Sequence, residues 1–270
     1  MKTRIIAAAV LLPVLLVILI ALPPVYTAVL LAAMSAVAAY ELLWGTGLVK
    51  HLRLVAIIAL FAAGVSIWCF FDRPYVWGLA GMLALTYLLF GELLISKTKL
   101  PFEKVLFCLA GGILIPYLLS AIVRIRNMEL GASLVLLPFV LAFLSDTGAY
   151  FAGVFLGKHK LCPNISPKKT VEGFFGGILG AVIGVILYGL VLTWMGCRVN
   201  FLYGVIYGVA GSLASVLGDL TFSVIKRQVG IKDYGNLIPG HGGILDRFDS
   251  MTVVAPVAEL LLLIMPLAVK

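Results

Sequence analysis

The sequence predicts an all-α protein, a polytopic integral membrane bundle of about nine transmembrane helices. Hydrophobic residues make up 63% of its 270 residues and charged residues only 12%, whereas soluble domains are about 45–50% apolar and about 25% charged. The apolar runs are about 18–25 residues long and do not alternate with polar residues, which suits helices and excludes barrel strands. Because a spanning segment must satisfy its own backbone hydrogen bonds in lipid, we expect helices packed against helices.

The predicted spans follow one another with short links over most of the chain. The first begins after Lys2 and Arg4, and its long apolar core and poor cleavage site favour a retained span over a signal peptide. With bounds accurate to a few residues, the spans are 5–22, 25–44, 54–71, 76–96, 104–123, 131–157, 173–195, 201–225 and 247–268.

The positive charges predict the orientation of these spans. Fifteen of the 20 lysines and arginines lie at the N-terminus and in the even-numbered connectors. The other five are Arg73, Arg124, Arg126, Arg198 and Lys270. Since cytoplasmic loops carry the excess of Lys and Arg, we expect a cytoplasmic N-terminus and two long loops that face the cytoplasm.

Polar residues concentrate in the second half of the chain. This predicts an N-terminal scaffold of about five spans, 1–130, and a C-terminal catalytic region of about four spans with two cytoplasmic loops, 131–270. Glu41 and Glu92 are exceptions in the first half, near cytoplasmic span ends. Each is expected to be an interfacial carboxylate or the partner of a basic residue.

Asp146 lies inside the predicted span 131–157, about 16 Å from its cytoplasmic end at 1.5 Å per residue. A carboxylate at that depth costs several kcal/mol unless it is paired, hydrated or bound to a metal. Gly148, Gly153 and Gly157 follow it, and small residues at this spacing are typical of close helix packing. Asp146 is therefore either a functional carboxylate or a hydrogen-bond partner of a neighbouring helix.

The loop after this span carries a compact SPKKT segment, residues 166–170. Thr170 is predicted to cap the next helix. A helix N-terminus beside Ser166, Lys168 and Lys169 suits an anion, although an ordinary positive-inside loop would also be basic.

One polar stripe runs along the predicted span 201–225. Ser215, Asp219, Ser223 and Lys226 follow at helical spacing, with Arg227 beside the last. A stripe of this kind facing lipid would be prohibitively costly, so it is expected to face a cavity or another helix.

The segment 239–249 combines glycines with two carboxylates. Its glycines can turn backbone N–H groups toward an anion, and Asp246 and Asp249 share one face of the following helix. With Asp219 they place three carboxylates at about one depth. Such hard oxygen ligands suit Mg²⁺, which is typically completed by substrate phosphates.

Together these motifs resemble the signature of the phosphatidate cytidylyltransferases, also called CDP-diacylglycerol synthases. The matching residues are Ser223-x-Ile225-Lys226-Arg227, Lys232-Asp233 and Ile238-Pro239-x-His241-Gly242-Gly243-x-x-Asp246-Arg247-x-Asp249, and upstream Ser145-Asp146-x-Gly148-Ala149-Tyr150, Gly157-Lys158 and Ser166-Pro167-Lys168-Lys169-Thr170-x-Glu172-Gly173.

The resemblance implies phospholipid biosynthesis, in which CTP and phosphatidate give CDP-diacylglycerol and pyrophosphate. It also implies a homodimer, and a single compact chain of this kind suits a bacterial inner membrane, with the active site facing the cytoplasm. The expected partners are CTP, phosphatidate, membrane lipids and a second copy of the chain, and no nucleic acid.

The residues permit this chemistry. A lipid phosphate monoester, with a second pKa of about 6, is largely ionised at neutral pH and needs no strong base. It does need divalent metal and lysines to relieve repulsion between two polyanions. We expect Mg²⁺ in a two-metal site, in which a monovalent ion such as K⁺ is an alternative second cation.

The expected roles fall into two groups. The principal metal ligands are Asp219 and Asp246, with Asp146 or Asp249 completing the site. The substrate-binding group consists of Ser166, Lys168, Lys169, Ser223, Lys226, Arg227, Lys232, His241, Gly242, Gly243 and Arg247. The residues expected to act in catalysis are Asp146, Asp219, Asp246, Lys226 and Arg227. Which base binds which phosphate stays open.

Other function classes fit some of these residues. Asp146, Asp219 and Glu259 inside the membrane could form the cation path of a coupled transporter, but that leaves both polar loops without a role. A CTP-dependent lipid-alcohol kinase shares the nucleotide and the membrane setting, but it should need a base near the acceptor hydroxyl. A CDP-alcohol phosphotransferase would carry a DGxxAR run, which the sequence lacks.

Overall fold

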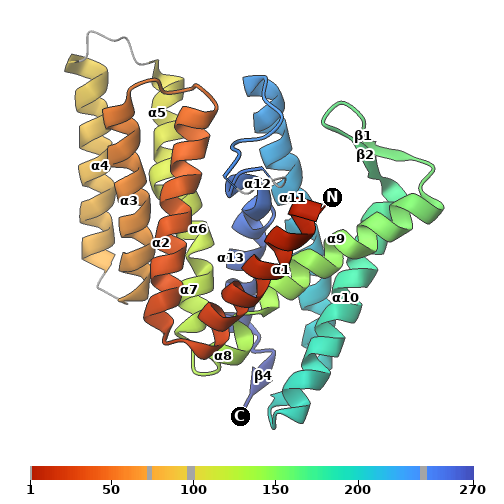
Figure 1. The fold of residues 1–270 in the computed structure, drawn as a ribbon. Coiled ribbons are helices and arrows are strands. Elements are labelled where there is room, and N and C mark those ends of the chain that lie inside the picture. Colours follow the sequence, from red (N-terminus) through yellow and green to blue (C-terminus); the bar gives the residue numbers. More distant parts are fainter. Residues whose placement is uncertain (1, 72–74, 96–100, 238–241) are drawn as a thin grey trace. The chain divides into compact units, whose positions relative to one another are not determined.

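The computed structural model describes residues 2–71, 75–95, 101–237 and 242–270. They form a helical protein with two compact units (Figure 1): Met1–Asn127 together with Ile231–Phe248, and Met128–Gly230 together with Asp249–Lys270. The all-α, polytopic membrane fold is confirmed. The predicted division of roles at residue 130 stays a prediction.

Seven helices in the described ranges are long and apolar enough to cross a membrane, and each coincides with a predicted span. The first and last predicted spans correspond to shorter apolar helices, Ala9–Ala21 and Met251–Ile264. The count of nine and the cytoplasmic N-terminus therefore stay predictions. The seven helices are Pro24–Gly45, Leu52–Phe70, Tyr75–Leu94, Phe102–Arg126, Gly131–Leu156, Val171–Trp194 and Phe201–Val229.

The first unit consists of α-helices that three short π-helical segments continue or connect. Proline sets the start of α2, because Pro24 fits the first turn, where its missing N–H is not needed. The elements are α1 (Lys2–Leu16), η1 (Val17–Ala21), α2 (Pro24–Tyr40), η2 (Glu41–Gly45), α3 (Leu52–Phe70), α4 (Tyr75–Ile95), α5 (Phe102–Leu109), η3 (Ala110–Leu114), α6 (Ile115–Leu119), α7 (Ala121–Arg126) and, late in the chain, α12 (Leu245–Phe248).

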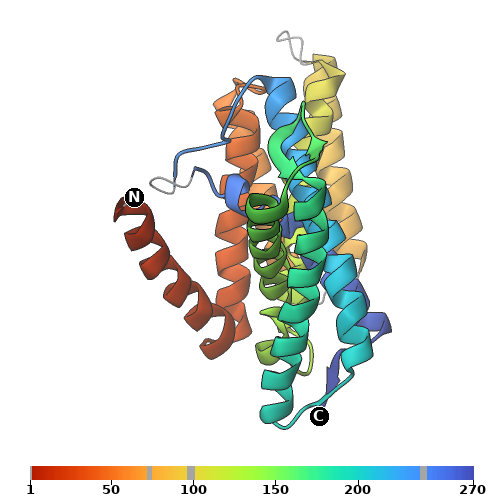
Figure 2. The same ribbon diagram turned by 90° about the vertical axis from the view of Figure 1, so that its right-hand side faces the viewer.

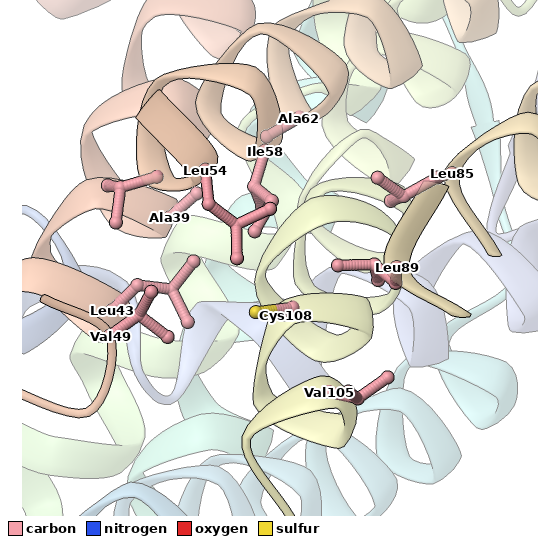
Figure 3. Close-up of a cluster of buried hydrophobic side chains, with 11 residues drawn as sticks. Ala39, Leu43, Val49, Leu54, Ile58, Ala62, Leu85, Leu89, Val105 and Cys108 are labelled. Atoms are coloured by element: carbon pink, nitrogen blue, oxygen red, sulfur yellow. The ribbon is translucent and has the colours of Figure 1, made fainter. Parts of the chain in front are cut away.

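A cluster of fully buried side chains joins α2, α3, α4 and α5 (Figure 3). Leu43, Ile58, Leu85 and Leu89 are completely inaccessible. Gly112 allows the close approach, since a Cβ there would lie 2.9 Å from Leu85 Cδ2. In lipid such tight packing, rather than the hydrophobic effect, holds helices together.

Three buried serine hydroxyls cross-link the same unit. Ser66 Oγ on α3 lies 3.0 Å from Ser35 Oγ on α2 and accepts a hydrogen bond of 3.0 Å from Ser120 Oγ. Hydroxyl pairs of this kind are typical polar contacts between membrane helices, worth about 0.6 kcal/mol each on average.

In the second unit, α9 and α10 pack backbone against backbone, as the glycine spacing predicts (Figure 2). A Cβ at Gly180 would lie 2.5 Å from Leu144 O and 3.0 Å from Gly148 Cα. The predicted cap is also confirmed, since Thr170 Oγ1 accepts the Gly173 N–H at 3.1 Å. The elements are α8 (Gly131–Leu134), α9 (Leu137–Leu156), β1 (Lys160–Cys162), β2 (Ser166–Thr170), α10 (Val171–Trp194), β3 (Arg198–Val199), α11 (Phe201–Val229), α13 (Met251–Ile264) and β4 (Ala268–Val269).

The loop predicted between α9 and α10 forms a small antiparallel hairpin, β1–β2 (Figure 1). Its base is tied to α10, because Glu172 Oε1 lies 2.7 Å from His159 Nδ1. The His159 side chain is otherwise solvent-exposed. The hairpin holds the SPKKT segment as an ordered strand that leads directly into α10.

Candidate functional site

The centre of the second unit's polar cluster is an ion pair between β2 and α11. Lys169 Nζ lies 2.5 Å from Asp219 Oδ2, and both side chains are partly exposed, by 25% and 33%. Ser223 Oγ, one turn along α11, donates to Asp219 Oδ1 at 3.3 Å. Asp219 therefore has one oxygen on a flexible lysine and the other on a neighbouring hydroxyl.

Asp146 on α9 faces α11, the helix that carries Asp219. Its Oδ1 accepts a hydrogen bond of 3.4 Å from Ser215 Oγ on α11. The adjacent Ser145 and Ser212 hydroxyls lie 2.8 Å apart and join the two helices. Of the predicted polar stripe on α11, Ser215 thus meets another helix and Asp219 meets the hairpin through Lys169.

Asp249 precedes α13 and lies outside the spanning helices. Gly218 lets α11 approach this point, since a Cβ there would lie 2.9 Å from Asp249 O. Burial, with the Asp219 charge as the next cause, raises the pKa of Asp249 to about 6, against a smaller lowering by Lys226. Each of these two carboxylates thus disfavours the ionisation of the other.

A cavity of about 450 Å³ opens beside this cluster, entirely within the second unit. One part of its wall is polar, formed by Asp146, Lys160, Lys168 and Lys169. Much of the remainder is apolar and includes Tyr150, Val154, Phe174 and Val216. The hairpin thus supplies three lysines to the lining of a cavity whose other lining residues belong largely to α9, α10 and α11.

The first unit holds the other half of the predicted signature. Asp246 on α12 is 7% exposed. Its Oδ2 accepts backbone N–H bonds from Tyr234 at 2.8 Å and Gly243 at 3.0 Å. Gly242, directly before Gly243, has a φ of 87°, a left-handed backbone conformation that favours glycine. His241 lies outside the described residues.

Glu41, at the start of η2, is a site residue whose role the sequence analysis left open. It is 4% exposed, and its two oxygens accept the backbone N–H groups of Ile244 at 3.0 Å and Leu245 at 2.9 Å. The available signal was a lone carboxylate in an apolar span, which needs a partner. The sequence did not indicate that the partner is the backbone of the glycine-rich segment.

The predicted site residues are therefore divided between the units. The second unit brings together Asp146, Lys168, Lys169, Asp219, Ser223, Lys226 and Asp249, with Ser166 half-buried on β2 and Arg227 exposed at the end of α11. The first unit contains Lys232, Gly242, Gly243, Asp246 and Arg247, of which Lys232 and Arg247 are exposed.

The donor chemistry of the second unit fits a divalent cation. Asp146, Asp219 and Asp249 are oxygen donors that interact electrostatically. In the described part of the chain, no group of three or more His, Cys, Asp or Glu side chains is already arranged around a metal position. Carboxylate oxygens are the ligands that Mg²⁺ takes, usually one or two of them together with substrate phosphates and water.

The fold and this site define a polytopic membrane protein with carboxylates and lysines around a partly apolar cavity. The chain belongs to the cytidylyltransferase family, whose sequence model matches residues 2–265.

Several bacterial proteins named phosphatidate cytidylyltransferase are similar over most of the chain. The Bacillus subtilis protein is 36% identical over 242 residues, 87% of both chains. The Staphylococcus epidermidis protein is 35% identical over 217 residues, 80% of this chain and 79% of its own. The Staphylococcus aureus protein is 39% identical over 185 residues, 68% of this chain and 69% of its own.

Proposed function

We propose that this protein is a phosphatidate cytidylyltransferase that makes CDP-diacylglycerol and pyrophosphate from CTP and phosphatidate. The observation that carries the proposal is the 36% identity to a protein of that name over 87% of both chains. The cavity with lysines at one side supports it, because this reaction joins a lipid anion to a nucleotide anion.

The reaction is a phosphoryl-group substitution. An oxygen of the phosphatidate phosphate attacks the α-phosphorus of CTP, and a new P–O bond forms. The bond from that phosphorus to the bridging oxygen of the β-phosphate breaks, and pyrophosphate leaves with the electron pair. Because the attacking phosphate is already largely ionised near pH 7, the residues mainly need to position the reactants and neutralise charge.

The cavity of the second unit suits the lipid substrate. Lys160, Lys168 and Lys169 would bind the phosphatidate phosphate, since ammonium groups form charge-assisted hydrogen bonds with phosphate oxygens. Tyr150 and Phe174 on the apolar wall would contact the glyceride and the start of the acyl chains.

Binding of the substrate phosphate would break the ion pair between Lys169 and Asp219. When a phosphate approaches the hairpin, the Lys169 ammonium would leave the Asp219 carboxylate and bind the phosphate oxygens instead. The Asp219 carboxylate would then be available as a metal ligand. Asp219 with Asp249 or Asp146 would then hold Mg²⁺, and Asp246 stays a proposed metal ligand. Bound Mg²⁺ would neutralise part of the negative charge of the phosphates. K⁺ is an alternative for the second cation. Ser223 would orient Asp219 through its 3.3 Å hydrogen bond.

The other basic residues of the signature complete the proposal. Lys226, Arg227, Lys232 and Arg247 would bind nucleotide phosphates. His241 and Gly242 would be further nucleotide contacts, and Ser166 would be a substrate contact on the hairpin. We also propose a homodimer in the bacterial inner membrane, surrounded by lipid and with the site open to the cytoplasm, where CTP is made. The family membership does not favour a lipid-alcohol kinase or a cation-coupled transporter.

The test is pyrophosphate release by the purified protein in detergent with CTP, phosphatidate and Mg²⁺. We expect release only when all three are present, none in EDTA, and none when ATP replaces CTP. Phosphorylation of an alcohol acceptor without pyrophosphate release would instead support the kinase. CTP-independent solute flux in proteoliposomes would support the transporter.

A further inference from the structure

We infer that Glu41 is a positioning residue for the reaction: its buried carboxylate fixes the backbone that carries Asp246. The inference rests on the proposed function for its kinetic consequences, but its structural content is independent of it. All the residues involved belong to the first unit.

The first step is the pair of hydrogen bonds at the start of α12. Glu41 Oε1 accepts from Ile244 N at 3.0 Å, and Oε2 accepts from Leu245 N at 2.9 Å. These N–H groups stand at the open end of a helical turn, where no backbone acceptor is available. A carboxylate, with two acceptor oxygens, satisfies both N–H groups.

The second step is the way the segment is shaped around Glu41. A Cβ at Gly235 would lie 2.5 Å from Glu41 Oε1, and a Cβ at Gly243 would overlap the same carboxylate. A side chain at either position would therefore displace the Glu41 carboxylate from its place. Packing against Glu41 therefore explains why glycine stands at position 243, without any contact with a nucleotide.

The third step connects Glu41 to Asp246. The Asp246 carboxylate is held by the N–H groups of Tyr234 and Gly243. Gly243 directly precedes Ile244, whose N–H is bound to Glu41. Two carboxylates thus hold successive N–H groups of one short stretch, and the rotamer of Asp246 depends on a backbone that Glu41 keeps in place.

The chemistry of this contact requires a carboxylate. Glutamine has nearly the same shape but only one acceptor oxygen, and its amide NH₂ would face one of the two backbone N–H groups. Glu41→Gln therefore keeps the volume and removes one hydrogen bond. Aspartate keeps both acceptors on a chain that is one methylene shorter, so Glu41→Asp tests distance rather than chemistry.

The experiment compares Glu41→Gln with wild type in detergent by two readouts. The first is the rate of tryptic cleavage after Lys232 and Arg247, two exposed sites in the segment that Glu41 holds. We expect several-fold faster cleavage in the variant without any substrate. The second is kinetic: a kcat about 10- to 100-fold lower and a higher Mg²⁺ concentration at half-maximal rate, as for other residues that orient metal ligands. The KM for phosphatidate should not change.

Two matched variants separate positioning from loss of stability. Glu103→Gln removes an exposed carboxylate of the same unit and should match wild type in every readout. Ser66→Ala breaks the buried serine contacts, so it should lower the melting temperature without changing cleavage at Lys232 or the Mg²⁺ dependence. If Glu41→Gln does not fold, Glu41→Asp should show a smaller change in the same directions.

The outcomes are distinct. Unchanged cleavage and unchanged Mg²⁺ dependence in a folded Glu41→Gln protein would overturn the inference. A change in melting temperature alone, as in Ser66→Ala, would also overturn it by showing only a stabilising role. If the wild type has no transferase activity, the proposed function fails, and the cleavage rates still decide whether Glu41 holds the segment.

Discussion

The two units use carboxylates in opposite ways. In the second unit, Asp219 is paired with the flexible ammonium of Lys169 and is partly exposed. In the first unit, Glu41 and Asp246 are buried and accept backbone N–H groups. A side chain can leave its partner when a substrate arrives, whereas a backbone partner moves only if the segment rearranges. The comparison indicates that Asp219 in the second unit can change its partner when a substrate binds, whereas Glu41 and Asp246 in the first unit keep theirs.

Metal removal should affect the two regions most differently. With EDTA we expect pyrophosphate release to fall to background and to return with Mg²⁺, because charge neutralisation by the metal supplies several kcal/mol. Tryptic cleavage after Lys232 and Arg247 in the absence of substrates should not change, since Glu41 and Asp246 already have backbone partners. Full activity in EDTA would contradict the metal proposal, and faster cleavage would contradict the distinction between the regions.

Replacing Asp219 should be nearly as damaging as removing the metal. We expect Asp219→Ala to lower kcat about 10³-fold, because losing several kcal/mol of charge stabilisation corresponds to that factor. The Asp219 side chain and its ion-pair partner Lys169 are both partly exposed, so the circular dichroism spectrum and melting temperature should remain close to wild type. Wild-type turnover in a folded Asp219→Ala protein would remove Asp219 from the site.

Lys169 should have a smaller effect that depends on the lipid substrate. A hydrogen bond to a charged group is worth about 1.5–3 kcal/mol, so Lys169→Met should lower kcat/KM for phosphatidate about 10- to 100-fold. The KM for CTP should change little, because the cavity is assigned to the lipid. Lys50→Met, which removes an exposed lysine of the first unit, is the matched control. A selective rise in the KM for CTP would reverse the assignment of the cavity.

The sequence predicted the features that depend on local pattern. Seven spans follow from apolar runs of sufficient length, and the stripe from Ser215 to Lys226 follows from helical spacing. Thr170 was identified as a cap because capping needs only its own backbone neighbours. Each of these rests on residues that lie close together in the chain.

The contacts that could not be predicted join distant segments. Glu41 and Ile244 are 203 residues apart, and no local pattern links an acid in an early span to a late glycine-rich segment. The hairpin was missed because its second strand, Ser166–Thr170, is short, polar and contains proline, unlike the alternating pattern of a strand. The pairing of Lys169 with Asp219 likewise depends on how that hairpin meets α11.

The smallest expected effect concerns repulsion within the second unit. The pKa of Asp249 is raised to about 6 from 3.8 by burial and by Asp219. For an acid with a raised folded-state pKa, the associated stability is present below about pH 4 and is lost as the pH rises through about 6. In EDTA, Asp249→Asn should therefore melt a few degrees above wild type at neutral pH and at the same temperature near pH 4. Mg²⁺ should narrow the difference at neutral pH, because a bound cation offsets the same repulsion. An equal difference at both pH values would show that Asp249 affects stability through packing rather than through charge.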